Sequence, residues 1–186
     1  MFSIALKVGA ESIVENQAGG SGAEVSSHIR AFREADAKGV DSVALAAFEQ
    51  YRHAYSDWAT LERAVGRMSA LAMEAELLVG EADGRVAAAV AYCRPFSEPR
   101  ASFFEPNWPL IRMLVVAPEA RGRGLGRSLT EACIERARRD GASSIALHTS
   151  PAMEVALSLY LRMGFRLERR VPDRFGVPYA VYLLDL

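Results

Sequence analysis

Three alternating glycines lie between an apolar run and a helical pattern in the second half of the chain. The segment is Arg121-Gly122-Arg123-Gly124-Leu125-Gly126. Glycine lets the backbone turn tightly and approach a ligand with no Cβ in the way. The first N–H groups of the following helix lack intrahelical partners and carry the positive end of the helix dipole. The spacing therefore predicts an anion site, for which a pyrophosphate is the usual occupant.

The glycine spacing separates this loop from two common phosphate-binding motifs. The pattern G-x-x-x-x-G-K-[ST] of nucleotide hydrolases is absent, and the loop has G-x-G-x-G where dinucleotide-binding folds have G-x-G-x-x-G. On spacing alone, a tight strand-to-helix turn that binds nothing stays open as an alternative. Arg121, Arg123 and Arg127 add positive charge around the loop.

The elements that must position this loop form a β-α-β unit followed by a second helix. Continuous apolar runs predict buried strands at Leu110–Val116 and Ser144–His148. Apolar residues at helical spacing predict one helix directly after the loop and another at Met153–Met163, which Gly164 closes. The loop therefore stands at the end of a strand and at the start of a helix.

Further strands and two more helices are expected outside this unit. In chain order we expect a strand at His28–Glu34, a helix capped by Asp41, a helix capped by Ser56 or Asp57, a hairpin turning at Asp83-Gly84, and final strands around Phe165–Arg170 and Tyr179–Leu184. Residues 11–27 are poor in large apolar side chains, which predicts a flexible N-terminal extension over about residues 1–27, before a single domain at 28–186.

The stretch Pro95–Pro109 holds four prolines in fifteen residues, which predicts a loop. Its aromatic residues include Phe103, Phe104 and Trp108. Two interpretations are open: the rings either contribute an apolar element to a substrate site or close the core.

The composition indicates one globular domain without a nucleic-acid partner. The 186 residues include 22 basic and 23 acidic side chains, a net charge of −1. Cys93 and Cys133 lie in apolar runs without metal-ligand spacing, and no apolar stretch is long enough for a membrane span, so we expect a cytoplasmic protein. The charge is uneven: residues 1–93 carry 8 basic and 13 acidic residues, whereas 94–186 carry 14 and 10. The second half is thus the part expected to bind an anion.

Two motifs, in this order, resemble the GCN5-related N-acetyltransferase (GNAT) superfamily. Arg121–Gly126 is similar to the family signature Q/R-x-x-G-x-G/A and follows a strand ending in Val-Ala-Pro. The segment Ala156–Phe165 resembles the family's helix ending A-x-x-L-Y-x-x-x-G-F. The resemblance is strongest over about residues 110–165 and does not cover 1–27.

The resemblance implies an α/β fold class with an α+β mixed sheet: a mostly antiparallel central sheet with a splayed parallel strand pair, flanked by about four helices. Acetyl-CoA, the implied co-substrate, would lie between the strands Leu110–Val116 and Ser144–His148, with no metal. Strand backbone would pair with the pantetheine arm, and loop amides would bind the pyrophosphate. The implied cofactor-binding residues are Leu114, Val115, Val116, Arg121, Gly122, Arg123, Gly124, Leu125, Gly126, Arg127 and Ser128.

The implied reaction is direct acetyl transfer from the thioester to a primary amine of a small molecule or protein. The backbone N–H of Leu114 or Val115 would polarise the thioester carbonyl. Tyr160 matches the family's general acid for the leaving thiolate, although it shares an apolar helix face with Ala156 and Met163.

The general base is open between several candidates. The amine must lose a proton before it attacks, and Glu105 and His148 are the main candidates for removing it. Glu98 is a weaker candidate, and many family members use a water relay instead. Met153 departs from the family pattern, because many members have an asparagine there that contacts the cofactor.

Other functions and partners remain as alternatives. A non-catalytic acyl-CoA-binding regulatory module of the same fold is the main one. Nucleic-acid binding is not expected, because Arg136, Arg138 and Arg139 stand among acidic residues on a solvated helix face. The acceptor pocket is expected from residues 41–72, 95–109 and 171–178, and the acidic first half favours a cationic acceptor. A homodimer is compatible with the sequence, and no membrane partner is expected.

Overall fold

The computed structural model describes residues 27–95 and 101–186 of the chain. The predicted extension at residues 1–27 lies outside the described residues except for Ser27, which begins the first strand. Glu98, the weaker candidate base, also lies outside them.

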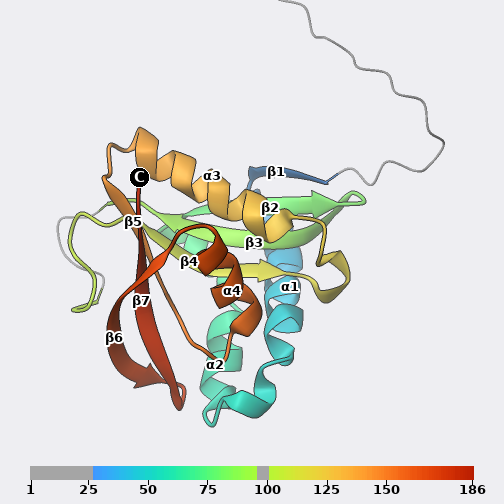
Figure 1. The fold of residues 1–186 in the computed structure, drawn as a ribbon. Coiled ribbons are helices and arrows are strands. Elements are labelled where there is room, and N and C mark those ends of the chain that lie inside the picture. The colour runs from blue at the N-terminus through green and yellow to red at the C-terminus, as the bar shows by residue number, and fades with distance from the viewer. Residues whose placement is uncertain (1–26, 96–100) are drawn as a thin grey trace, which may run out of the picture.

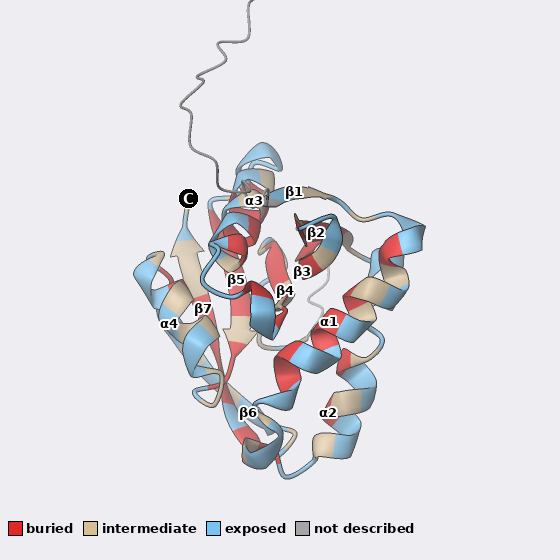
Figure 2. Ribbon diagram, turned by 90° about the vertical axis from the view of Figure 1, so that its right-hand side faces the viewer, coloured by how far each residue is buried: buried red, intermediate tan, exposed pale blue. Residues whose placement is uncertain are grey.

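Seven strands form one mixed sheet in the order β1-β2-β3-β4-β5-β7-β6 (Figure 1). The strands are β1 (Ser27–Ala31), β2 (Glu76–Ala82), β3 (Arg85–Cys93), β4 (Leu110–Val116), β5 (Ser144–Thr149), β6 (Arg166–Arg174) and β7 (Val177–Asp185). Every neighbouring pair is antiparallel except β4 and β5, which are parallel. Figure 2 shows the central strands largely buried and the edge strand β6 largely exposed. The expected fold class is confirmed.

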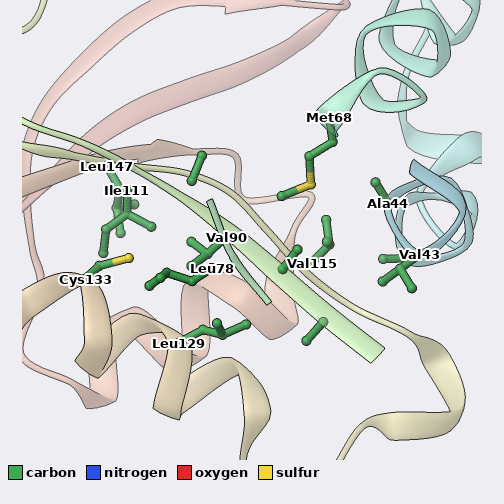
Figure 3. Close-up of a cluster of buried hydrophobic side chains, with 14 of the residues drawn as sticks. Val43, Ala44, Met68, Leu78, Val90, Ile111, Val115, Leu129, Cys133 and Leu147 are labelled. Carbon is green, nitrogen blue, oxygen red and sulfur yellow. The ribbon is translucent and has the colours of Figure 1, made fainter. Parts of the chain in front are cut away.

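Helices cover both faces of the sheet. They are α1 (Ala37–Glu49), α2 (Trp58–Val65), α3 (Leu125–Arg139) and α4 (Glu154–Arg162), with short 3-10 turns η1 (Glu34–Asp36), η2 (Arg52–Ala54), η3 (Met68–Met73) and η4 (Pro118–Ala120). Figure 3 shows Val43 and Ala44 of α1 on one side of the strands and Leu129 and Cys133 of α3 on the other. Within the described residues, none of the helices combines the length and apolar character that crossing a membrane requires.

Local signals located the turns and caps with one error. Asp57 caps α2 by accepting a hydrogen bond from the Thr60 amide, and the hairpin turns at Asp83-Gly84 as predicted. Asp41 does not begin a helix, because α1 already starts at Ala37. Its carboxylate instead accepts hydrogen bonds from the amide and hydroxyl of Ser69, at 2.7 and 2.9 Å. The acidic side chain thus ties α1 to η3.

A bulge in β4 separates it from β5. Met113 has a φ of +54°, and between the pairs Ala89–Val115 and Ala91–Arg112 the strand β4 carries one residue more than β3. The parallel ladder with β5 is limited to Leu110 and Ile111, which precede the bulge. A bulge bends its strand and interrupts the local ladder. The two parallel strands therefore diverge beyond Ile111, as the expected splayed pair requires.

Candidate functional site

Two cavities lie beside the diverging strands and share part of their walls. The larger has a volume of about 380 Å³ and the smaller about 200 Å³. Phe48, Leu114, Met153 and Ala156 line both of them. The bulged part of β4 and the start of α4 therefore border both cavities, and molecules held in the two would meet beside Leu114.

The glycine loop forms one end of the larger cavity. Gly122 and Gly124 adopt φ values of +78° and +79°, and a Cβ added to either would meet no atom within 4 Å. The N–H of Ser128 donates to the Gly124 carbonyl at 3.0 Å, and no side chain caps the start of α3. The amides before Ser128 have no intrahelical acceptor. The loop therefore offers open backbone donors, which is the geometry of an anion site.

Nine of the eleven predicted cofactor-binding residues line the larger cavity. They are Leu114, Val115, Val116, Arg121, Gly122, Gly124, Leu125, Gly126 and Arg127. Arg123 and Ser128 do not line it. The guanidinium of Arg123 pairs with Asp83 in the β2–β3 turn at 2.9 Å, and Ser128 is an exposed residue of α3. For these two residues the structure does not support the predicted contact.

The arginines around the loop are held by neighbouring residues. Arg121 donates to the Gln50 side chain at 3.2 Å and to the Ala47 carbonyl at 3.5 Å, which joins the loop to the end of α1. Arg127 pairs with Glu131 one turn along α3 at 2.8 Å. Backbone amides, rather than unengaged guanidinium groups, thus provide most of the anion-binding geometry of the loop.

Tyr160 reaches the smaller cavity from α4. Its side chain is buried, and its ring packs edge-on against Phe165 with the centroids 5.6 Å apart. Within the described chain its hydroxyl has no hydrogen-bond partner. Burial raises the pKa of the hydroxyl, so the group stays protonated at neutral pH. The ring belongs to the core, while the hydroxyl remains available to donate to a ligand.

His148 lines the smaller cavity at the end of β5. Its Nε2 lies 3.3 Å from Nη1 of Arg174. A guanidinium can only donate, so Nε2 accepts and the neutral ring carries its proton on Nδ1. Burial, followed by the charges of Arg174 and Arg112, lowers the pKa of His148 to about 4. His148 therefore lines the smaller cavity, but it is a weak base, and its Nε2 lone pair already accepts a hydrogen bond from Arg174.

The described part of the aromatic loop, residues 101–109, packs behind His148 and lines neither cavity. Phe103 and Phe104 lie 5.9 and 5.7 Å from the His148 ring, centroid to centroid. Phe104 is buried in a second core cluster with Cys93, and Phe103 and Trp108 pack against that cluster. These rings therefore close the core, which is the second of the two interpretations open from the sequence.

Glu105 is not brought to either cavity. It is exposed, and its carboxylate pairs with Arg169 of β6 at 3.0 Å. The same guanidinium lies over the Trp108 ring, 5.3 Å from its centroid. The edge strand thus supplies a partner that holds Glu105 on the surface. The geometry gives no support to Glu105 as the general base.

The smaller cavity has walls that the sequence predicted only in part. Residues 41–72 and 171–178 contribute as expected, whereas 101–109 do not, and β4 and β5 supply the remainder. Its described lining contains Arg67, Arg112 and Arg174 but no aspartate or glutamate. The electrostatic character is positive, opposite to that expected from the acidic first half. Among the described residues, no group of three or more metal-ligating side chains forms a metal site.

Sequence reasoning missed two features of the junction. Phe48 of α1 lines both cavities, yet helical spacing cannot distinguish it from other core positions. The bulge at Met113 carries no glycine or proline that would signal a positive φ. Met153, which departs from the family pattern, also lines both cavities, and its sulfur accepts a hydrogen bond from Thr149 at 3.6 Å.

Comparison with known proteins identifies similar sequences. Residues 40–165 match the acetyltransferase (GNAT) family. N-alpha-acetyltransferase 30 of Schizosaccharomyces pombe is 38% identical over 61 residues, which are 33% of this chain and 41% of that protein. N-acetyltransferase 8B of Mus musculus is 34% identical over 88 residues, 47% of this chain and 36% of that protein. The chain thus spans less than half the length of these curated relatives.

Solved structures share the fold over most of the chain. A GCN5-related N-acetyltransferase from Rhodopseudomonas palustris has a TM-score of 0.68 and 19% identity, covering 87% of this chain and 98% of that one. A GNAT family acetyltransferase from Brucella melitensis, in complex with acetyl-CoA, has a TM-score of 0.59 and 25% identity, with coverages of 84% and 96%. The paiA N-acetyltransferase from Thermoplasma acidophilum, in complex with coenzyme A, has a TM-score of 0.64 and 17% identity. The match covers 87% of this chain and 99% of that one.

Proposed function

Because the chain belongs to the GNAT acetyltransferase family, we propose that it transfers an acetyl group from acetyl-CoA directly to a primary amine. The observation that carries the proposal is the junction of the two cavities at Leu114, with the unpartnered hydroxyl of Tyr160 in the smaller one. A thioester in the larger cavity and an amine in the smaller would meet there. Such an arrangement replaces a bimolecular encounter with a positioned one.

The larger cavity suits acetyl-CoA in shape and in its donors. The amides at Gly122, Gly124 and the first turn of α3 would bind the pyrophosphate, since no Cβ obstructs the approach. The pantetheine arm would follow β4 beyond the bulge, where β5 has left the ladder. An amide of Leu114 or Val115 would then donate to the thioester carbonyl as negative charge develops on its oxygen.

Proton transfer in the proposed reaction involves Tyr160 and water. The amine nitrogen forms a bond to the acetyl carbon, the bond from that carbon to sulfur breaks, and the amine proton leaves to solvent. Tyr160 donates its proton to the departing thiolate and takes one back from solvent before the next turnover. His148 is a poor base with its pKa of about 4, so water rather than a single side chain accepts the amine proton.

A non-catalytic acyl-CoA-binding module is the second candidate function. It requires only the glycine loop and the larger cavity. The smaller cavity and the Tyr160 side chain that lines it favour the enzyme, because binding of acyl-CoA alone requires neither. A cytoplasmic location accords with the burial of Cys93 and Cys133 and is part of the proposal.

The test is release of free CoA thiol from acetyl-CoA across a panel of amines, with the acetylated products identified by mass spectrometry. The expected result is thiol release that depends on an amine and matches the acetylated product in amount. Binding of acetyl-CoA without turnover of any amine would favour the binding module. An absence of acetyl-CoA binding by calorimetry would overturn both candidates.

A further inference from the structure

The smaller cavity, in which the amine acceptor would bind, is lined by positively charged side chains. Arg67, Arg112 and Arg174 line it, whereas its described lining holds no carboxylate; Glu74, which pairs with Arg112 at 3.4 Å, is not part of that lining. Polyamines and other cationic acceptors would therefore be repelled from it. An acceptor with its own negative charge would be attracted, and that charge would have to lie away from the reacting nitrogen.

Arg174 has no ion-pair partner among the described residues. Its polar partner among the described residues is the neutral ring of His148, and its guanidinium lies 5.4 Å from the centroid of the Phe175 ring. No described carboxylate lies within ion-pair distance of it. Its side chain thus offers planar, paired donors that match a carboxylate.

Arg112 stands near the same ring and is only weakly paired. Its Nη1 lies 3.4 Å from Oε1 of Glu74, which is long for a charge-assisted hydrogen bond. Both Arg112 and Arg174 depress the pKa of His148, so both charges lie close to this imidazole. Two arginines, one from β4 and one from the end of β6, therefore line the cavity and contribute positive charge near His148.

The charged and reacting ends of the cavity are different places. None of the three arginines lines the larger cavity, whereas Leu114 and Ala156 line both. A ligand anion at Arg112 and Arg174 would leave the rest of the molecule to extend toward Leu114 and Tyr160. The acetyl donor in the larger cavity and the negative charge of the acceptor would therefore be held apart.

The remaining wall is apolar and the space is small. Leu61, Val65, Leu71, Ile111 and Phe175 line it. Its volume of about 200 Å³ is below the range of about 300–1,000 Å³ found for drug-sized ligands. The cavity thus fits a compact molecule with an apolar side chain rather than a long peptide or an aminoglycoside.

We propose that the acceptor is a small amino acid-like molecule with a free amine, a carboxylate and an apolar side chain, whose carboxylate binds Arg112 and Arg174. The proposal rests on the proposed acetyl transfer and names its substrate class. In this arrangement the amine points to Leu114, the apolar side chain packs against Leu61 and Phe175, and Arg67 contributes longer-range attraction.

The experiment compares acceptors that differ only in the carboxylate. L-Leucine, L-leucinamide and 3-methylbutylamine share one side chain, and spermidine and a leucine-initiated peptide extend the panel. Thiol release should be fastest with L-leucine, and kcat/KM should fall at least about tenfold when the carboxylate is amidated or removed, as expected for loss of charge-assisted hydrogen bonds. Equal or faster turnover of leucinamide, 3-methylbutylamine, spermidine or the peptide would overturn the proposal.

Variants test whether Arg112 and Arg174 bind the carboxylate of the acceptor. Arg112→Gln and Arg174→Gln should each raise KM for L-leucine at least about tenfold while leaving acetyl-CoA affinity unchanged. Arg138→Gln is the matched control, because Arg138 pairs with Glu135 on the outer face of α3. An unchanged KM in both cavity variants would contradict the assignment.

Failure of this proposal is distinguishable from failure of acetyl transfer. If acetyl-CoA binds and amines without a carboxylate are acetylated as well as L-leucine, only the acceptor class is wrong. If no amine of any charge is acetylated, the proposed function itself fails, and the acceptor proposal fails with it. Calorimetry with acetyl-CoA, run on every variant, separates these results from a loss of folding.

Discussion

Nη1 of Arg174 lies 3.3 Å from Nε2 of His148, a contact that joins the end of β6 to the end of β5. Since the arginine can only donate, the contact holds His148 as a neutral ring that has no free lone pair at Nε2. The same arginine faces the smaller cavity. One contact therefore weakens the most obvious general base and places a cation beside the proposed acceptor.

The pH–rate profile should follow the amine rather than His148. With the pKa of His148 at about 4, the ring is neutral across the range in which amines deprotonate. We expect the rising limb of kcat/KM to move when two acceptors of clearly different amine pKa are compared. The measurement is thiol release against pH for both acceptors. A limb fixed at one pH for both, and abolished by His148→Gln, would assign the base to His148 after all.

His148 should also make the fold less stable in mild acid. Its ordinary pKa is 6.5 and its folded value about 4, so between these values the unfolded chain binds more protons than the folded one. Stability contributed by this group therefore falls as the pH falls through that window. The expected loss between pH 7 and pH 5 is about 1–2 kcal/mol.

Urea unfolding at the two pH values measures this loss. His148→Gln should flatten the pH dependence by about that amount, whatever its effect on stability at pH 7. His53→Gln, at an exposed position outside both cavities, is the control and should leave the slope unchanged. Equal slopes for the wild-type protein and His148→Gln would show that the ring titrates normally.

Replacing Tyr160 with phenylalanine should slow catalysis without unfolding the site. The ring, its burial and its contact with Phe165 are kept, and only the hydroxyl is lost. We expect kcat to fall about 100-fold, the lower end for general acid catalysis, with acetyl-CoA affinity unchanged.

Tyr92→Phe is a matched control for that change. The Tyr92 hydroxyl donates to Asp140 at 2.8 Å, and neither residue lines either cavity. Its loss should lower the free energy of unfolding by about 1 kcal/mol and leave kcat unchanged. If Tyr160→Phe keeps full turnover at every pH, the tyrosine is a core residue and not the acid.

The sequence was most informative where local chemistry alone decides the structure. The glycine loop, the cap at Asp57 and the hairpin at Asp83-Gly84 depend on turn and cap preferences that are visible in a few neighbouring residues. Asp41 is also a good cap by type, but a tertiary contact with Ser69 engages it inside α1. Local preference therefore indicates that such a residue can cap a helix, but it does not indicate which group the residue contacts in the fold.

The site was less predictable because its decisive features arise from pairing between distant segments. The bulge at Met113 depends on the register of β4 against β3, which an apolar run does not encode. The charge of the smaller cavity is set by arginines from three separate segments, while no described acidic residue of the first half lines it. Counting charges along the chain therefore predicted the opposite sign to the charge that the arginines give this cavity.

The variant Gly124→Ala should fold but should bind acetyl-CoA poorly. Its φ is +79°, so an alanine there costs about 1–2 kcal/mol of strain, and its Cβ would enter the open space above the loop. We expect acetyl-CoA affinity, measured by calorimetry, to fall at least about tenfold, comparable to losing a charge-assisted hydrogen bond.

Gly141→Ala controls for the strain in that experiment. Gly141 ends α3 with a φ of +74°, also has open space around it, and lines neither cavity. The two variants should lose similar stability, yet only Gly124→Ala should bind acetyl-CoA poorly. Normal affinity in Gly124→Ala, or an equal loss in Gly141→Ala, would contradict the assignment of the loop to the pyrophosphate.

Gly176 positions the β6–β7 turn that carries Arg174 and Phe175 into the smaller cavity. Its φ is +81°, and an added Cβ would lie 1.7 Å from Oγ and 3.0 Å from Cβ of Ser56, in the loop before α2. Gly176→Ala should therefore displace the turn, raise KM for the acceptor and leave acetyl-CoA affinity unchanged. Gly84→Ala, where φ is +71° and no atom lies within 4 Å, should show only the strain of about 1–2 kcal/mol. Combining Gly176→Ala with Ser56→Gly removes the clash, so the acceptor KM should recover while the strain remains. An acceptor KM that is unchanged in Gly176→Ala, or that fails to recover in the double variant, would separate this turn from acceptor binding.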